Sequence, residues 1–321
     1  MPLVSSAYRA PYYLKNGHLA TIFPNIFRKV EGPEYCRERF ETEDGDFLDL
    51  DWVEKGNSRL LIISHGLEGS SERPYVRGMA KYFSSRGWDV VAWNCRSCSG
   101  EMNRVLRLYH HGDTEDLEAV IRHAQAKNEY EHLALTGFSM GGSMVLNLLG
   151  QGMATLPAEV VGGVVFSVPC DLGASARHLS APGNGFYRKR FLKKLIRKMH
   201  EKHRSFPDRV AISGAEAIRH FAEFDNQFTA PLHGFENAEE FYLKASANQY
   251  LSNIQHPVLI VNAANDPFLP PACYPVKLAE NHPSVHLEIP EEGGHVGFMM
   301  KGRRETYAEV RAYEFFEGIL M

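Results

Sequence analysis

The fold is decided by the stretch Leu133-Ala134-Leu135-Thr136-Gly137-Phe138-Ser139-Met140-Gly141-Gly142-Ser143-Met144-Val145-Leu146. An apolar run typical of a buried strand ends in Gly-x-Ser-x-Gly, and an amphipathic helical pattern follows at once. This pattern is typical of a nucleophile elbow, in which a serine sits on a strained strand-to-helix turn with its hydroxyl exposed. Side chains at Gly137 and Gly141 would collide where such a turn doubles back. The pattern predicts that Ser139 is a nucleophile, a role that requires partners from elsewhere in the chain.

The composition is that of an ordinary globular protein. Of the 321 residues 44% are hydrophobic and 23% are charged, and the net charge of −4 gives no signal of nucleic-acid binding. The five cysteines are odd in number and scattered, which argues against a secreted disulfide framework. No apolar segment is long enough to span a bilayer, and the first six residues lack the features of a signal peptide. We expect a cytoplasmic protein that binds no nucleic acid and has no transmembrane segment.

Strand-like runs alternate with helix-like runs over most of the chain. Besides the run before Ser139, the expected strands are Tyr35–Glu41, Asp46–Val53, Arg59–Ser64, Trp88–Asn94, Glu159–Val168, Pro257–Ala263 and Val285–Ile289. Such alternation predicts an α/β fold with a mostly parallel sheet and helices on both faces. The first forty residues are rich in aromatic residues and punctuated by proline, and we expect them to form an irregular arm.

The alternation stops between Pro169 and about Gln255. We predict that the chain is a single domain, residues 1–321, with a helical cap inserted at approximately 170–250. Such a cap would lie over the carboxyl edge of the sheet, where open α/β sheets bind ligands. Its most basic segment, Arg188–Arg204, carries an apolar stripe that we expect to pack inward, with the cations in water. Peripheral contact with an anionic membrane surface is the alternative for this helix.

A serine hydroxyl needs a base, an orienting acid and donors for the oxyanion. Asp266 follows the strand-like run Pro257–Ala263, and His295 lies in a glycine-flanked loop after the last such run. Ser139, Asp266 and His295 thus occur in the chain order of enzymes that carry their nucleophile on an elbow. We predict that these three residues are catalytic. Glu291 and Glu292 are weaker rivals of Asp266, because they lie on the loop of the histidine itself.

The oxyanion donors are expected on two loops. His65-Gly66-Leu67 follows the strand that precedes the first helix, where a hydrolase places one donor. We predict that the backbone N–H groups of Leu67 and Met140 bind the oxyanion and that His65 holds the shape of its loop. Cys95-x-x-Cys98 lacks a second pair of ligands at a suitable spacing, so we expect neither a metal nor an organic cofactor.

Several longer motifs carry a resemblance to a known family. They include Asn16-Gly17-His18-Leu19-Ala20-Thr21, Ser64-His65-Gly66-Leu67-Glu68-Gly69, Tyr109-His110-His111-Gly112-Asp113, Gly137-Phe138-Ser139-Met140-Gly141-Gly142 and Asp266-Pro267-Phe268. With these motifs nearly the whole chain resembles the α/β-hydrolase family that contains the bacterial YheT-type esterases, the AB hydrolase 4 family. Its eukaryotic relatives are membrane-anchored phospholipase-like hydrolases and the yeast medium-chain ethyl ester synthases.

The resemblance implies an α/β-hydrolase fold and a relay of Ser139, Asp266 and His295. Relatives often carry a second acid before Asp-Pro-Phe, whereas this chain has Asn265, which favours Asp266 as the working acid. The chain also lacks the N-terminal membrane segment of the anchored relatives and resembles the bacterial type.

We therefore predict a serine hydrolase that cleaves carboxylic esters through an acyl-enzyme. The expected substrate is a small-molecule ester, and a lipid-like ester is one open alternative. The first alternative is an acyltransferase that passes the same acyl group to an alcohol. The second is a non-catalytic binding protein that retains a vestigial site.

Overall fold

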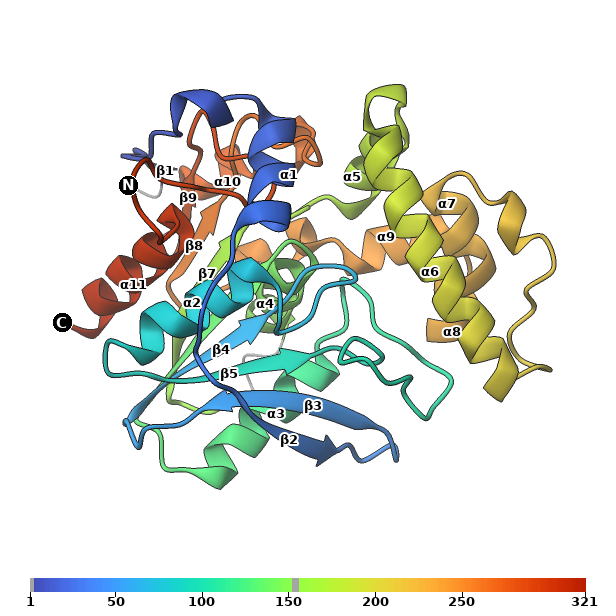
Figure 1. The fold of residues 1–321 in the computed structure, drawn as a ribbon, viewed down its shortest axis with the longest axis horizontal. Helices are drawn as coiled ribbons and strands as arrows, with labels where there is room; N and C mark the ends of the chain where they lie inside the picture. Colours follow the sequence, from blue (N-terminus) through green and yellow to red (C-terminus); the bar gives the residue numbers. More distant parts are fainter. Residues whose placement is uncertain (1–2, 152–155) are drawn as a thin grey trace.

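A nine-stranded sheet forms the centre of the computed structural model, which describes residues 3–151 and 156–321 (Figure 1). Its strand order is β1-β9-β8-β7-β6-β4-β5-β3-β2. The strands are β1 (Leu3–Val4), β2 (Cys36–Glu41), β3 (Phe47–Val53), β4 (Arg59–Ser64), β5 (Asp89–Asn94), β6 (His132–Phe138), β7 (Val160–Phe166), β8 (Val258–Val261) and β9 (Val285–Glu288). The predicted α/β class is confirmed.

Most neighbouring strands are parallel. The exceptions are β2 and β3, which form an antiparallel hairpin, and β3 with β5, which are also antiparallel. The hairpin turns at Gly45, whose φ of 79° lies in the left-handed region that glycine tolerates. Because β4, β6, β7, β8 and β9 are parallel, their carboxyl ends meet at one edge of the sheet.

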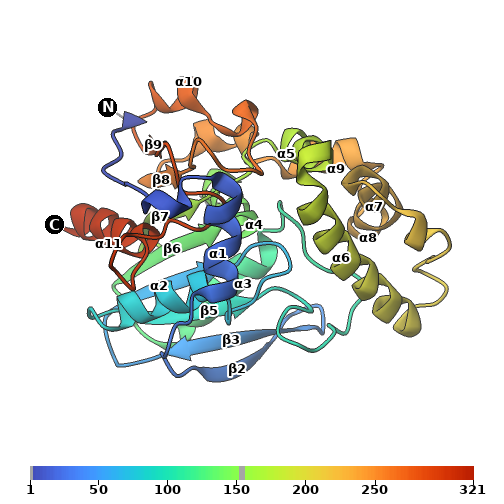
Figure 2. The ribbon, with the colours of Figure 1, turned by 45° about the horizontal axis from the view of Figure 1, so that its top comes forward.

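Helices cover both faces of the sheet (Figure 2). Successive residues of β4 point to opposite faces, so that Leu61 and Ile63 pack with α2 and α11 while Leu60 and Ile62 pack with α3 and α4. These four helices are α2 (Pro74–Ser84), α11 (Tyr307–Leu320), α3 (Glu115–Lys127) and α4 (Met140–Gln151). Burial on both faces explains why the central strands are continuously apolar rather than alternating.

A group of helices lies between β7 and β8 in the chain. They are α5 (Leu172–Ser180), α6 (Gly185–Ser205), α7 (Phe221–Phe224), α8 (Ala230–His233) and α9 (Ala238–Ala245), and we call residues 172–245 the helical insertion. In Figure 1 they form a separate layer beside the sheet, on the right of the view. The insertion occupies the part of the chain where the sequence predicts a cap, and the division into a domain and a cap stays a prediction. After β8 comes the short helix α10 (Val276–Ala279).

The expectation of an irregular N-terminal arm is wrong. Residues Leu3–Val4 add β1 to the sheet beside β9, and Gly17–Phe27 form the helix α1. Asn16 caps this helix, because its side-chain oxygen accepts hydrogen bonds from the N–H groups of His18 and Leu19 at 3.0 and 3.1 Å. Pro24 lies inside the helix, where it removes a backbone donor, and this obscures the helix in the sequence.

Among the described residues, no helix combines the length and the apolar character that crossing a bilayer requires.

Replacement of Gly141 by alanine is expected to destabilise the fold. A Cβ atom at this position would lie 2.3 Å from the carbonyl oxygen of Ser64, and that oxygen belongs to the backbone of β4. We expect the free energy of unfolding to fall by about 3 kcal/mol. The matched control is Gly318→Ala in α11, where a Cβ meets nothing within 4 Å and should stabilise the helix by about 0.5–1 kcal/mol. Denaturant unfolding measures both values, and equal effects of the two substitutions would contradict this account.

Candidate active site

Ser139 occupies the turn between β6 and α4. Its φ is 54°, a left-handed conformation that is strained for a residue other than glycine. The turn is tight because a Cβ on Gly137 would lie 2.3 Å from the carbonyl oxygen of Gly141. The N–H of Ser139 donates to the carbonyl of Phe166 at 2.8 Å, which holds the turn against the end of β7. The sequence motif thus has a concrete cause, because only glycine fits on either side of the serine.

The structure brings Ser139, His295 and Asp266 into one line of hydrogen bonds. Nε2 of His295 lies 2.9 Å from Oγ of Ser139, and Nδ1 of His295 lies 2.9 and 3.1 Å from the two carboxylate oxygens of Asp266. The carboxylate accepts, so Nδ1 carries the proton and Nε2 is free to accept from the serine hydroxyl. This arrangement can withdraw a proton from Ser139 and hold the resulting imidazolium beside a negative charge.

Two contacts from Phe268 hold Asp266 and His295 in place. Its backbone N–H donates to Oδ1 of Asp266 at 2.8 Å, and its ring stacks on the imidazole of His295 with the ring centres 3.9 Å apart. Asp266 and His295 are both buried. The rival acids are directed elsewhere, since Glu291 is exposed and Glu292 lies 3.8 Å from the ammonium group of Lys15.

The helix α1 supports the loop that carries His295. Oγ1 of Thr21 accepts a hydrogen bond from the N–H of His295 at 2.8 Å and donates to the carbonyl of Gly17 at 2.6 Å. Asn265 binds the same loop, because its side-chain oxygen accepts from the N–H of Gly294 at 2.9 Å and its amide donates to the carbonyl of Lys15 at 2.8 Å. Thr21 was not predicted as a site residue, although the motif Asn16–Thr21 marked this segment as part of the family pattern. Asn265 therefore positions the histidine loop in place of a second acid.

The loop predicted to carry an oxyanion donor is held by His65. The N–H of Cys95 donates to Nε2 of His65 at 3.1 Å, so the ring proton lies on Nδ1, which donates to the carbonyl of Gly66 at 2.8 Å. Burial lowers the pKa of His65 to about 4, so the ring is neutral near pH 7. The neutral imidazole makes a hydrogen bond at each of its two nitrogens. It therefore shapes the loop and has no free nitrogen for proton exchange.

The two predicted oxyanion donors lie on either side of Ser139. A Cβ on Gly66 would stand 3.2 Å from Cβ of Ser139, so the loop with Leu67 is directly beside the nucleophile, and Met140 is the next residue in the chain. Within residues 3–151 and 156–321, neither the N–H of Leu67 nor that of Met140 donates a hydrogen bond to a protein acceptor. Both donors are therefore available to an oxygen atom at this position.

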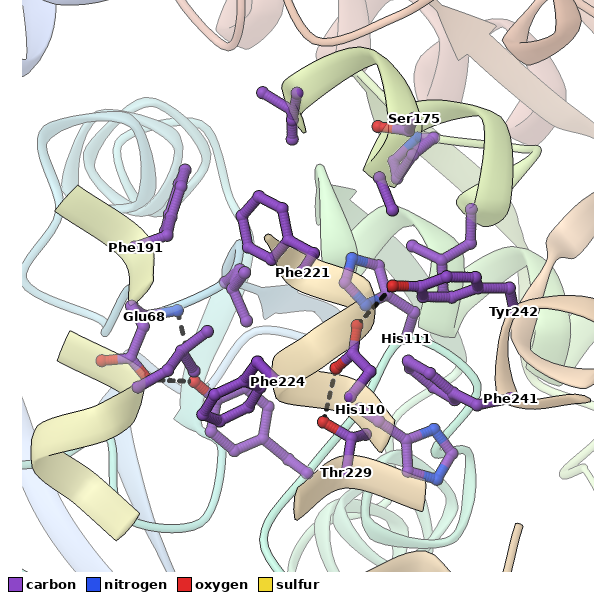
Figure 3. A pocket seen from close by; sticks show the side chains of 18 of the residues that line it. Glu68, His110, His111, Ser175, Phe191, Phe221, Phe224, Thr229, Phe241 and Tyr242 are labelled. Carbon is purple, nitrogen blue, oxygen red and sulfur yellow. Dashed lines mark hydrogen bonds between the residues drawn. The ribbon is translucent and has the colours of Figure 1, made fainter. Parts of the chain in front are cut away.

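An apolar pocket leads from Ser139 into the helical insertion (Figure 3). We call it the apolar pocket; it has a volume of about 980 Å³, and its walls include Leu172, Leu179, Phe221, Phe224, Phe228 and Phe241. Polar residues of the motif Tyr109-His110-His111 also reach it. Burial lowers the pKa of His111 to about 4, so this side chain is neutral near pH 7. The pocket thus suits an apolar chain. The sequence did not reveal that His110 and His111 line such a pocket.

The apolar stripe of the basic helix α6 packs inward as expected, but not all of its cations lie in water. Leu192, Ile196 and Met199 are buried, as predicted. Lys202, however, is fully buried and donates to the carbonyls of Asn103 and Val105 at 3.0 and 2.6 Å. Burial lowers its pKa to about 8. The prediction that the cations remain in water is wrong here, because these carbonyls satisfy the ammonium group in place of water.

Comparisons with known proteins agree with this geometry. Residues 59–301 match the model of the α/β-hydrolase fold family. The chain is 36% identical to the YheT protein of Escherichia coli (strain K12) over 291 residues, which covers 88% of this chain and 84% of that protein. It is 29% identical to the mouse phospholipase ABHD3 over 331 residues, covering 99% of this chain and 80% of that protein. The sheet, the elbow and these matches define the class of protein as an α/β hydrolase.

The chain belongs to the α/β-hydrolase family, in the group that contains YheT. Among solved structures, an esterase of Pyrococcus furiosus superposes with a TM-score of 0.59 at 18% identity, covering 91% of this chain and 96% of that one, which supports the fold. The phospholipase relative and the match to YheT support an ester-hydrolase activity.

Thr21→Val is expected to impair the site without removing a catalytic group. Valine keeps the volume of threonine but leaves the buried N–H of His295 without its acceptor, so the imidazole should shift. We expect kcat for a nitrophenyl ester to fall by about 10- to 100-fold, because small misplacements of a base have effects of this size. The conservative variant Thr21→Ser keeps the acceptor oxygen and should restore most of kcat. Equal loss in both variants would show that the hydroxyl does not position His295.

Proposed function

We propose that this chain is a serine hydrolase of carboxylic esters that acts through Ser139, His295 and Asp266. The observation that carries the proposal is the unbroken line of hydrogen bonds from the Ser139 hydroxyl to the Asp266 carboxylate. The serine lies beside two unoccupied backbone donors and opens onto the apolar pocket. Nucleophile, base, acid and oxyanion donors therefore occur together, which is the full requirement of acyl transfer to serine.

The reaction follows from this geometry. Oγ of Ser139 attacks the ester carbonyl while Nε2 of His295 takes the hydroxyl proton. The N–H groups of Leu67 and Met140 stabilise the oxyanion, and each such donor contributes about 3–4 kcal/mol to the transition state. The bond to the alcohol oxygen then breaks, and the imidazolium returns the proton to that oxygen. Water, activated by the same histidine, releases the acid from the acyl-enzyme.

The acyl chain occupies the apolar pocket in this proposal. Leucine and phenylalanine side chains of the helical insertion form much of the wall, and they favour a hydrocarbon chain over a polar group. The relatives point the same way, since they include phospholipase ABHD3 and a monoacylglycerol lipase of Saccharomyces cerevisiae, which is 30% identical over 260 residues. The latter match covers 78% of this chain and 57% of that protein. A lipid-like ester is therefore the proposed substrate class.

The role of Ser139 can be tested by covalent labelling. A fluorophosphonate should modify the wild-type protein at one serine, and Ser139→Ala should lose both the label and ester hydrolysis, with kcat reduced by about 10⁵-fold or more. Intact-mass spectrometry and peptide mapping locate the label. Ser143→Ala is the matched control, because it removes the hydroxyl of a buried serine in α4, four residues beyond Ser139. Equal labelling of Ser139→Ala and the wild type would contradict the assignment.

The role of Asp266 has its own test. Asp266→Asn keeps the shape of the side chain but stabilises the wrong tautomer of His295, so kcat should fall by about 10⁴-fold. Glu292→Gln should change kcat by less than about threefold, since this residue faces Lys15. Steady-state hydrolysis of one nitrophenyl ester compares the two variants, and a larger effect at Glu292 would give the acid role to that residue.

The acyl preference follows from the apolar pocket. Each buried methylene contributes about 0.8 kcal/mol, so kcat/KM for nitrophenyl esters should rise by up to about fourfold per added methylene until the pocket is filled. Ala176→Trp introduces a large ring into the wall of the pocket and should shift the preferred chain to a shorter one. A flat chain-length profile in the wild type, or an unchanged optimum in the variant, would exclude the apolar pocket as the acyl site.

A further inference from the structure

A second pocket meets the apolar pocket at the catalytic residues. It lies between α1 and α6, has a volume of about 790 Å³ and shares Ser139, His295 and Leu67 with the apolar pocket. Three cationic side chains line it, namely Arg73, Arg190 and Lys194, and we call it the basic pocket. The nucleophile thus has an apolar space on one side and a space walled by positive charge on the other.

The charges of the two pockets are balanced differently. In the apolar pocket, the ammonium group of Lys198 pairs with the carboxylate of Glu68 at 2.6 Å. In the basic pocket, Arg73 and Lys194 both donate to the backbone carbonyl of Glu68, at 2.8 and 3.3 Å. Across residues 3–151 and 156–321, no carboxylate lies within 4.0 Å of the cationic nitrogens of Arg73, Arg190 or Lys194. Glu68 also lines the basic pocket, but its carboxylate is paired with Lys198, so among the described residues the three cations have no ion-pair partner within 4.0 Å.

Lys194 is partly buried beside the other cations of this pocket. Burial lowers the pKa of Lys194 most, and the charge of Arg73 lowers it next. The charge of Glu68 opposes this shift, and Arg190 and Lys198 lower the pKa by smaller amounts. A bound anion would relieve this repulsion and supply the acceptors that the protein does not provide.

Both pockets reach Ser139 and His295, so the basic pocket is the space left for the alcohol portion when the acyl chain is assigned to the apolar pocket. Besides His295 itself, the walls of the basic pocket include Val296, the next residue, and Thr21, which binds the backbone of His295. The leaving oxygen must lie next to His295 because it receives its proton from Nε2. The exposed side chains of Ile26 and Phe186 stand at the same opening, so the ligand there meets both apolar and cationic surface.

We propose that the basic pocket binds a phosphate group on the alcohol portion of the ester, while the acyl chain occupies the apolar pocket. A phosphate monoester carries a charge of about −1.5 to −2 and three strong acceptor oxygens, which match three cations better than a single carboxylate does. This inference rests on the proposed ester hydrolysis. In the acylation step the bond from Ser139 Oγ to the acyl carbon forms, the bond from that carbon to the alcohol oxygen breaks, and His295 protonates the departing phosphate-bearing alcohol.

The test compares two esters that differ only in the phosphate. 1-Decanoylglycerol and 1-decanoylglycerol 3-phosphate are hydrolysed below their aggregation concentrations, and the ratio of their kcat/KM values is measured. We expect the wild type to prefer the phosphate ester by about tenfold or more. Lys194→Gln and Arg190→Gln should each lower this ratio by about three- to tenfold. Arg190 is exposed, so its substitution is expected to leave folding intact.

Lys193→Gln is the matched control, because it removes the same charge from the position just before Lys194 in α6. The side chain of Lys193 is exposed and lies outside the basic pocket. It should change the ratio by less than about twofold. Competition separates the sources of the phosphate: glycerol 3-phosphate should inhibit competitively, and more weakly in Lys194→Gln, whereas inorganic phosphate that inhibits equally well would assign the pocket to free phosphate. Inhibition by glycerol 3-phosphate or by inorganic phosphate would support an anion site in the basic pocket. Absence of inhibition by both compounds would overturn it.

The two proposals fail in different ways. Hydrolysis of both esters that persists in Ser139→Ala would refute the catalytic assignment itself. Hydrolysis that depends on Ser139 but favours the neutral ester, or a ratio that Lys193→Gln lowers as much as Lys194→Gln, would refute only the phosphate site.

Discussion

The hydrogen bond between Ser139 and His295 is the interaction on which the site depends, and it joins residues 156 positions apart in the chain. Neither residue could reach the other without the parallel sheet. Ser139 follows β6, Asp266 follows β8 and His295 follows β9, and the parallel pairing of β6 to β9 brings these three strand ends to one edge. The core beneath them is rigid because central strands are buried on both faces. Sheet pairing thus sets the distances on which proton transfer depends.

The loops above this edge hold conformations that the chain alone disfavours. Ser139, Ser167 and Val296 all have φ near 54°, a region costing roughly 1–3 kcal/mol for each such residue. The surrounding contacts offset that strain. The N–H of Val296 donates to Oγ of Ser167 at 2.9 Å, and a Cβ on Gly297 would lie 2.2 Å from the carbonyl oxygen of Ala20 in α1. Close packing against α1 therefore leaves the histidine loop little room to relax.

What the sequence predicted and what it missed have physical reasons. The elbow, Asp266 and His295 could be found because each follows an apolar run, so local pattern and chain order suffice. The part played by Thr21 could not, since its contact with His295 joins positions 274 apart and no local pattern encodes it. The walls of the apolar pocket were equally hidden, because helices of the insertion pack through angles that periodicity leaves open. For the same reason Lys202 looked like a solvated cation, although three oxygens of the loop Asn103–Val105 surround it.

Glu68 joins the oxyanion loop to the helical insertion through both its side chain and its backbone. Its carboxylate accepts from Lys198 and from the Tyr109 hydroxyl at 2.6 Å each, and its carbonyl accepts from Lys194. Two lysines one turn apart on α6 therefore hold Glu68, the residue next to Leu67. Breaking either contact would leave a charge or a carbonyl poorly satisfied in a confined site, which is costly. The position of α6 and the geometry of the loop with Leu67 are consequently linked, so the helix that lines both pockets also helps to set the loop beside Ser139.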